Sequence, residues 1–122
     1  MKLATGVDLI EIERVKSVLA RHGQHYLERV FTPGERELCG KRADSLAVRF
    51  AAKEAVSKAL GSGIGEVTFQ DIEILQDDQG APVLHLHGMA AEKAGKLGLT
   101  SWSLSLSHNL TMAIAMVTAL GD

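Results

Sequence analysis

The spacing of hydrophobic residues changes several times along the chain, and each change predicts a new element. Residues 3–9 form a short apolar run, which is typical of a strand that ends near Asp8. From Ile12 onward, hydrophobic residues recur at helical intervals, and Gly23 is expected to end that helix. A second, short helix is predicted over residues 26–31.

The next two helices carry their own start and stop signals. Residues 32–35 read Thr-Pro-Gly-Glu, the form of a capping box with proline at the first helical position. A longer, alanine-rich helix, capped by Asp44 or Ser45, is predicted to run to Leu60, where Gly61 ends it.

Extended segments dominate after the alanine-rich helix. Apolar and polar positions alternate over residues 67–74, and a shift in that alternation near Asp71 predicts a β-bulge. A turn at residues 77–80 leads to a returning strand at residues 83–86, and a short helix follows at residues 89–97.

The C-terminal segment predicts two strands with different faces. Serine alternates with large apolar residues over residues 101–107, so one face of that strand carries small polar side chains. Residues 111–120 are apolar on both faces and need cover on both, and a subunit interface could supply the second cover. The predicted fold class is α+β, a single domain over residues 1–122 in which an N-terminal strand and helices pack on a mainly antiparallel sheet.

Composition places the chain among ordinary globular domains. It has the length of one domain, 122 residues, and 46% hydrophobic and 23% charged residues leave enough apolar material for a core. The single cysteine, Cys39, excludes an internal disulfide and fits a reducing compartment. No apolar run is long enough to span a membrane, and Asp8 comes too early for a secretory signal, so we expect a cytoplasmic protein.

Charge is unevenly distributed along the chain. The net charge of −2 does not indicate a nucleic-acid binder. Residues 1–60 hold 11 Lys and Arg against 8 Asp and Glu, whereas residues 61–122 hold 2 against 7. The first half could therefore meet a polyanion or an acidic protein, although solvated helix faces would produce the same asymmetry.

One face of the alanine-rich helix carries candidate chemistry. Glu54, Ser57 and Lys58 share this face through three- and four-residue spacings; Lys53 lies beside it and Arg49 one turn earlier. One carboxylate among several cations suits a metal-bound polyphosphate, because the carboxylate holds a hard cation and the cations neutralise phosphate oxygens. The competing interpretation is a solvated surface helix with a Glu54–Lys58 ion pair, worth about 0.3–0.5 kcal/mol.

Asp8 is a second candidate because it ends an otherwise apolar strand, where burial of a lone charge is costly. Gly6 permits close approach of the backbone there. Asp8 and Glu54 together would supply the one or two carboxylates that commonly hold Mg²⁺ alongside substrate phosphates. A helix cap or a solvated strand end is the commoner role of an isolated aspartate.

Histidines and arginines outside this helix add further candidates. His108 closes the serine-rich strand, where it could donate to a phosphate, exchange a proton or serve only as a turn residue. His85 and His87 point the same way from a strand but lack further ligands, so we expect ordinary strand residues rather than a metal site. Arg14 and Arg21 project from nearly the same side of the first helix, towards an acidic partner or solvent.

Three segments, in this order, resemble the holo-acyl-carrier-protein synthases, the short, trimeric class of phosphopantetheinyl transferases. They are Gly6-Val7-Asp8 followed by Arg14, the helix from Arg49 to Gly61, and the terminal Ser105-Leu106-Ser107-His108. The resemblance covers nearly the whole chain. It implies transfer of 4′-phosphopantetheine from coenzyme A to a serine of apo acyl carrier protein, with release of 3′,5′-ADP, in fatty acid biosynthesis.

The resemblance also implies roles for individual residues, in an active site between neighbouring subunits of a homotrimer. Asp8 and Glu54 would hold Mg²⁺, and Lys58 would stabilise charge on the leaving phosphate. His108 would contact coenzyme A near its phosphates. The other expected coenzyme A contacts are Phe50, Ser57 and Gly61, with Lys41, Arg42 and Arg49 at the 3′-phosphate and adenosine end. Arg14 and Arg21 would receive the acidic helix of the carrier protein.

The general base stays open, since either Glu54 or a metal-bound water held by Asp8 could remove the serine proton. Two other functional classes fit the residues less well. A nucleic-acid-binding module would need base-stacking aromatic residues near its cations, and only 4% of the residues are aromatic. A metal-nucleotide hydrolase would need a phosphate-cradling loop before a helix and a clear water activator, and the sequence has neither.

Overall fold

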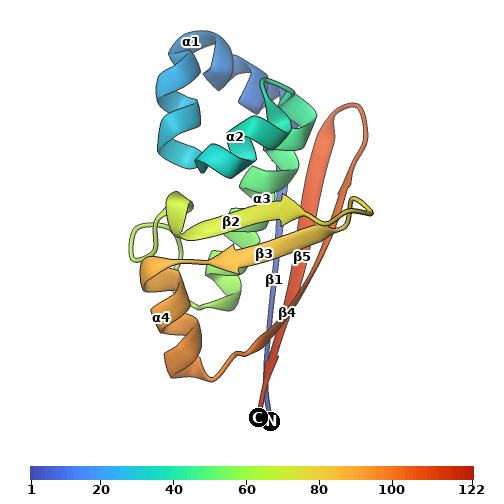
Figure 1. Cartoon of the computed structure of the whole chain (residues 1–122). Helices are drawn as coiled ribbons and strands as arrows, with labels where there is room; N and C mark the ends of the chain where they lie inside the picture. The colour runs from blue at the N-terminus through green and yellow to red at the C-terminus, as the bar shows by residue number, and fades with distance from the viewer.

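The longest strands come from the two ends of the chain and lie side by side. The computed structural model describes residues 1–122, in which β1 (Lys2–Glu11) pairs antiparallel with β5 (Met112–Gly121). On its other edge β5 pairs antiparallel with β4 (Ser101–His108), so the strand order is β1-β5-β4 and the two termini lie together (Figure 1). One face of β5 is buried, whereas the apolar residues of its other face are exposed in the single chain.

Three helices follow β1, close to where the sequence predicts them. The two helices expected around Gly23 form one element, α1 (Ile12–Val30), with a break at Gly23, whose backbone has φ 50° and ψ −122°. The capping box is confirmed at the start of α2 (Pro33–Cys39). The predicted cap of the third helix, α3 (Ala43–Ala59), is wrong: the N-cap is Arg42 rather than Asp44 or Ser45, because the carbonyl of Arg42 accepts the amide of Leu46 and closes the first turn.

A two-stranded hairpin and a short helix complete the fold. Antiparallel strands β2 (Ile72–Gln76) and β3 (Pro82–Leu86) form the hairpin, and α4 (Gly88–Leu97) leads from it to β4. The predicted bulged strand from residue 67 is wrong in its first half, where a 3-10 turn (Phe69–Asp71) precedes β2. The reason is local capping, since the Asp71 carboxylate accepts the amide of Thr68 at 3.1 Å.

The helix α3 lies at the centre of the molecule, between the three-stranded sheet and the hairpin (Figure 1). Small side chains let it pack closely on the sheet. Those buried in this contact are Ala51, Ala52, Ala55, Ala59, Ala115, Val117 and Ala119. On its other side, α3 donates hydrogen bonds to backbone carbonyls of β2.

The face of the three-stranded sheet that points away from α3 has no cover in the single chain. Its apolar side chains are between 40% and 66% exposed. They are Leu3, Val7, Leu9, Ile114, Met116 and Leu120. The strand register places the serines of β4, which are Ser101, Ser103, Ser105 and Ser107, in the same rows. We call this surface the open face. Separately, none of the helices combines the length and apolar character needed to cross a bilayer.

Candidate active site

A close contact between β1 and α3 brings the candidate residues together. A Cβ atom added to Gly6 would lie 1.9 Å from the carbonyl oxygen of Ala55, so no other residue fits there without moving the backbone. Side chains alternate along a strand, so Asp8 emerges on the same face of β1 as Gly6 and meets the next turn of α3. The predicted close approach of the backbone at Gly6 is confirmed.

Asp8 and Lys58 are in direct contact. The Lys58 Nζ lies 3.1 Å from the Asp8 Oδ1 and donates a second hydrogen bond of 2.9 Å to the carbonyl of Val7. The Lys58 side chain is still 53% exposed, so its ammonium faces solvent as well as the carboxylate. Glu54 lies one turn before Lys58 on the same face of α3. The structure therefore brings Asp8, Glu54 and Lys58 together.

The electrostatics of Glu54 favour capture of a cation. Burial raises the pKa of Glu54, the negative charge of Asp8 raises it further, and the positive charge of Lys58 opposes both. Two carboxylates that disfavour each other's charge gain from a cation placed near both.

The donor set fits a divalent ion that keeps open positions. No group of three or more His, Cys, Asp and Glu side chains gathers as a metal cage. Mg²⁺ is commonly held by one or two carboxylates, with water and substrate phosphates supplying the other ligands. Asp8 and Glu54 are therefore suited to hold Mg²⁺ with a phosphate-bearing substrate.

A cleft of about 230 Å³ opens beside the two carboxylates. It is lined by Asp8, Glu54, Arg14 and Phe50, together with Tyr26. Burial raises the pKa of Tyr26 to about 12, so its hydroxyl stays protonated at neutral pH. The structure thus brings Arg14 and Phe50 to the predicted metal pair.

A second hollow, of about 380 Å³, continues along α1 and shares Tyr26 and Phe50 with the first. Its polar lining comes from His22, His25 and Arg29. The two hollows adjoin along α1, and we call them together the groove along α1; Arg29 lines the outer hollow and Arg14 the hollow that contains the carboxylates.

His108 and Arg42 lie in a different place. They line an open hollow together with Lys16, while β5 separates the strand of His108 from that of Asp8. The His108 Nδ1 lies 3.3 Å from the carbonyl of Asn109. Lys41, just before Arg42, is exposed. Within one chain, these residues are not brought to the carboxylate pair.

The remaining predicted residues do not line either cleft of α1. Arg49 is buried and donates from Nε to the carbonyl of Ile74 at 3.0 Å. The buried Ser57 hydroxyl donates to the carbonyl of Glu54 at 2.7 Å. Gly61 follows α3 with φ 73°, and Arg21 is exposed on α1.

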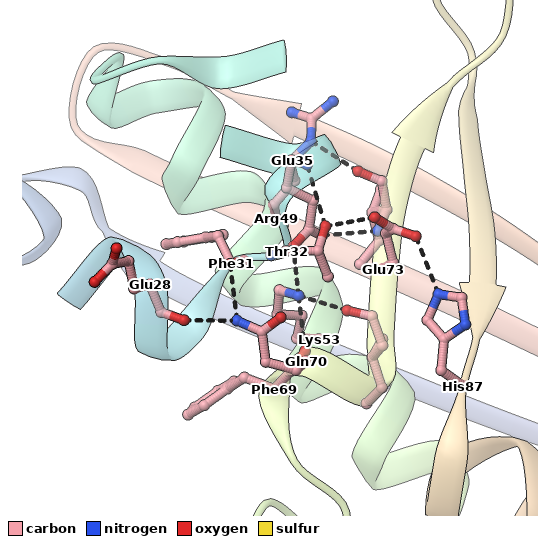
Figure 2. A network of polar contacts seen from close by, with 12 residues as sticks. Glu28, Phe31, Thr32, Glu35, Arg49, Lys53, Phe69, Gln70, Glu73 and His87 are labelled. Atoms are coloured by element: carbon pink, nitrogen blue, oxygen red, sulfur yellow. Dashed lines mark hydrogen bonds and ion pairs between the residues drawn. The ribbon is translucent and has the colours of Figure 1, made fainter. Parts of the chain in front are cut away.

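Sequence reasoning missed a buried polar network between α2, α3 and the hairpin (Figure 2). Lys53 and Glu35 form an ion pair, with 2.7 Å between Nζ and Oε1 and no exposure of either side chain. Burial lowers the pKa of Lys53, and the charge of Glu35 opposes that shift. The only signals in the sequence are the capping box that contains Glu35 and the position of Lys53 beside Glu54.

The network reaches the surface through Glu73. The Thr32 hydroxyl donates to Oε2 of Glu73, and Oε1 of Glu73 lies 3.0 Å from the His87 Nε2. Burial raises the pKa of Glu73, but the hydrogen bonds from Thr32 and His87, with the positive charge of His87, outweigh burial and lower it. The contact with Glu73 therefore accounts for the orientation of the His87 ring.

Comparison with known proteins extends over the whole chain. The family model described as 4′-phosphopantetheinyl transferase superfamily matches residues 4–115. The holo-[acyl-carrier-protein] synthase of Herpetosiphon aurantiacus is 48% identical over 126 residues, which cover 98% of this chain and 99% of that protein. The enzyme of the same name from Dehalococcoides mccartyi strain CBDB1 is 50% identical over 117 residues, covering 96% and 98%.

A solved structure agrees in both sequence and fold. The crystal structure of Helicobacter pylori holo-[acyl-carrier-protein] synthase in complex with coenzyme A has a TM-score of 0.87 and 38% identity. The match covers 95% of this chain and 99% of the other. With its α+β fold and its carboxylate pair beside Lys58, the chain belongs to the 4′-phosphopantetheinyl transferase superfamily, among the holo-[acyl-carrier-protein] synthases.

Proposed function

We propose that this protein transfers 4′-phosphopantetheine from coenzyme A to a serine of an apo acyl carrier protein and releases 3′,5′-ADP. The observation that carries the proposal is the meeting of Asp8, Glu54 and Lys58 at the β1–α3 contact, in a chain that matches holo-[acyl-carrier-protein] synthases over its full length. The Helicobacter pylori relative was solved with coenzyme A, which makes that donor the natural one here.

We assign Mg²⁺ to the Asp8–Glu54 pair. The ion would neutralise the diphosphate of coenzyme A and stabilise charge that develops on it during transfer. The protein's own part is to hold two carboxylates on rigid elements, one on β1 and one on α3, at the mouth of a cleft. The α3 face of β1 packs directly on α3, so the two groups keep their relative position.

Lys58 supplies the fixed positive charge for the leaving group. The displacement at the β-phosphorus forms the serine–phosphate bond and breaks the bond to the 3′,5′-ADP oxygen, on which negative charge collects. An exposed ammonium beside Asp8 can turn to that oxygen without losing its place on α3. Glu54, or a water that Asp8 holds, takes the serine proton.

The groove along α1 is the proposed carrier-protein surface. Arg14 lines its inner end at the carboxylates, and Arg29 lines its outer part with two histidines. Arg21 adds an exposed cation on the same helix. Such a surface attracts an acidic helix and steers its serine towards the cleft.

The open face is the proposed contact between the subunits of a homotrimer. Its apolar rows on β1 and β5 form an exposed apolar patch of the kind that marks an interaction site, and the serines of β4 permit close approach. Association through this face would let the His108 and Arg42 hollow of one subunit complete the coenzyme A site of another. Arg49 is buried and donates to a carbonyl of β2, whereas Lys41 and Arg42 are exposed, so we place the 3′-phosphate contact on Arg42 and Lys41.

The proposal is tested by chromatographic detection of 3′,5′-ADP from coenzyme A. Release should require the protein, a divalent metal ion and an apo acyl carrier protein used in fatty acid synthesis. A carrier protein with alanine in place of its acceptor serine is the control. Release of 3′,5′-ADP with that control would indicate hydrolysis of coenzyme A and contradict the transfer.

A further inference from the structure

Three consecutive residues of α3 face three different parts of the molecule. Successive helical residues are about 100° apart, so Lys53 and Ala55 lie on nearly opposite sides with Glu54 between them. Ala55 contacts Gly6 of the sheet, whereas Lys53 faces the hairpin. The direction in which Glu54 points is therefore fixed by what holds its two neighbours.

On the hairpin side, the ammonium of Lys53 uses all of its donors. It contacts Oε1 of Glu35 at 2.7 Å and donates to the carbonyls of Phe69, at 2.8 Å, and of Ile72. It also lies 5.7 Å from the centre of the Phe31 ring. A rotation of α3 about its axis would move the Lys53 ammonium away from Glu35 and from both carbonyls together.

Glu35 links the Lys53 ammonium to two further parts of the chain (Figure 2). Its Oε1 accepts the amide of Thr32 at 2.9 Å, and its Oε2 accepts the amide of Ile74 at 2.8 Å. The carbonyl of Ile74 in turn accepts from Arg49, one turn before Lys53 on α3. Both polar groups of one β2 residue are thus held, one directly by α3 and one through Glu35.

Stability alone does not account for this arrangement. Replacing a buried ion pair by apolar residues of similar volume is often neutral or stabilising, because desolvation of the charges offsets their attraction. Hydrogen bonds are directional, however, so the contacts of Lys53 and Glu35 restrict the rotation of α3 more narrowly than apolar packing alone does.

We propose that Lys53 and Glu35 are positioning residues, whose buried ion pair sets the rotation of α3 so that Glu54 faces Asp8. The pair touches no substrate and acts through the helix that carries Glu54 and Lys58. This inference rests on the proposed function, because it assigns the pair a role in holding the Asp8–Glu54 site in register.

The test compares the wild type with a Lys53→Met/Glu35→Leu double variant, which keeps the volume and removes both charges. Mn²⁺ binding by electron paramagnetic resonance, thermal unfolding, and kcat and KM are measured for each. We expect a folded protein of lower thermal stability, because the buried amides of Thr32 and Ile74 lose their acceptor, and in this folded protein Mn²⁺ affinity and kcat should each fall about tenfold. Both KM values should change less, because the clefts that bind the substrates are untouched.

A matched control is Glu73→Gln, which alters the outer end of the network without touching α3. It should leave Mn²⁺ affinity and kcat within about twofold of the wild type. If the double variant does not fold, Glu35→Asp serves instead, since it keeps the charge and shortens the reach, and it should also weaken Mn²⁺ binding. Wild-type Mn²⁺ affinity and kcat in a folded double variant or in Glu35→Asp would overturn the inference. Failure of the wild type itself to bind Mn²⁺ and transfer phosphopantetheine would overturn the proposed function instead.

Discussion

Lys58 and Asp8 lie 50 residues apart in the sequence, yet the lysine Nζ is 3.1 Å from the aspartate Oδ1. A cation therefore already neutralises one of the two carboxylates assigned to Mg²⁺. When the metal ion and coenzyme A bind, we expect this ammonium to exchange Asp8 for a phosphate oxygen. Lys58 is therefore part of the site both before and after the metal ion and coenzyme A bind.

Lys58→Ala should separate metal binding from catalysis. Loss of the lysine removes a positive charge from Asp8, so Mn²⁺ alone should bind at least as tightly as to the wild type. Turnover should fall about 100-fold, because charge on the leaving phosphate loses its fixed partner. A Mn²⁺ titration and steady-state kinetics check both. Weaker binding of Mn²⁺ would mean that Lys58 supports the metal site rather than the leaving group.

As the pH falls, the affinity for Mn²⁺ should begin to drop at a higher pH than it would if Glu54 had the usual pKa of a glutamate. Burial and the charge of Asp8 raise the pKa of Glu54 above the usual 4.5, so Glu54 takes up its proton at a higher pH and loses its affinity for cations. Mn²⁺ affinity measured from pH 8 downward should report this step. In metal-free Asp8→Asn protein, the titration of the Glu54 carboxyl followed by NMR should move to lower pH than in the metal-free wild type, since one of the causes is removed. If the pH of this titration did not change, the charge of Asp8 would not contribute to the raised pKa of Glu54.

Gly6→Ala should destabilise the protein by about 1–3 kcal/mol or more, because its Cβ would overlap the carbonyl of Ala55 and push β1 away from α3. The matched control is Gly95→Ala in α4, where a Cβ meets nothing within 4 Å. That substitution should stabilise by about 0.5–1 kcal/mol through helix propensity. Urea unfolding of both variants measures the difference in the free energy of unfolding. Equal free energies would show that β1 and α3 can move apart at little cost.

Met116→Glu should prevent association through the open face. A charge in the middle of the apolar rows cannot be buried without a partner, so the proposed trimer should give way to single chains with little activity. Met89, on α4, is exposed to the same degree, 50% against 51%, and Met89→Glu should leave the assembly intact. Light scattering coupled to size exclusion measures the mass. A trimeric, fully active Met116→Glu protein would place the interface elsewhere.

Much of the fold follows from local signals in the sequence. The capping box at Thr32, the glycine after α3 and the serine alternation of β4 each predict a boundary or a strand that the structure contains. The carboxylate pair is also brought together as the sequence predicts, since Gly6 lets the strand of Asp8 approach the helix of Glu54. These predictions succeed because each depends on neighbours in the chain or on one close contact.

The direction of the cations on α3 could not be predicted in the same way. Buried residues occur on almost every side of this helix, so its sequence has no clear polar face from which to read what Arg49 and Lys53 contact. Both turn to β2, whose position depends on the hairpin and on Glu35. The 3-10 turn before β2 was missed for a related reason, because the Thr68–Asp71 cap competes locally with the strand.

The most direct measurement is the intact mass of an apo acyl carrier protein after incubation with this protein, coenzyme A and Mg²⁺. The account predicts a gain of one phosphopantetheine group per carrier chain with the wild type, and no gain with EDTA or with folded Asp8→Asn protein. An unchanged mass with several carrier proteins and a folded wild type would contradict the proposed activity. A full gain with Asp8→Asn would contradict the metal site on which the mechanism depends.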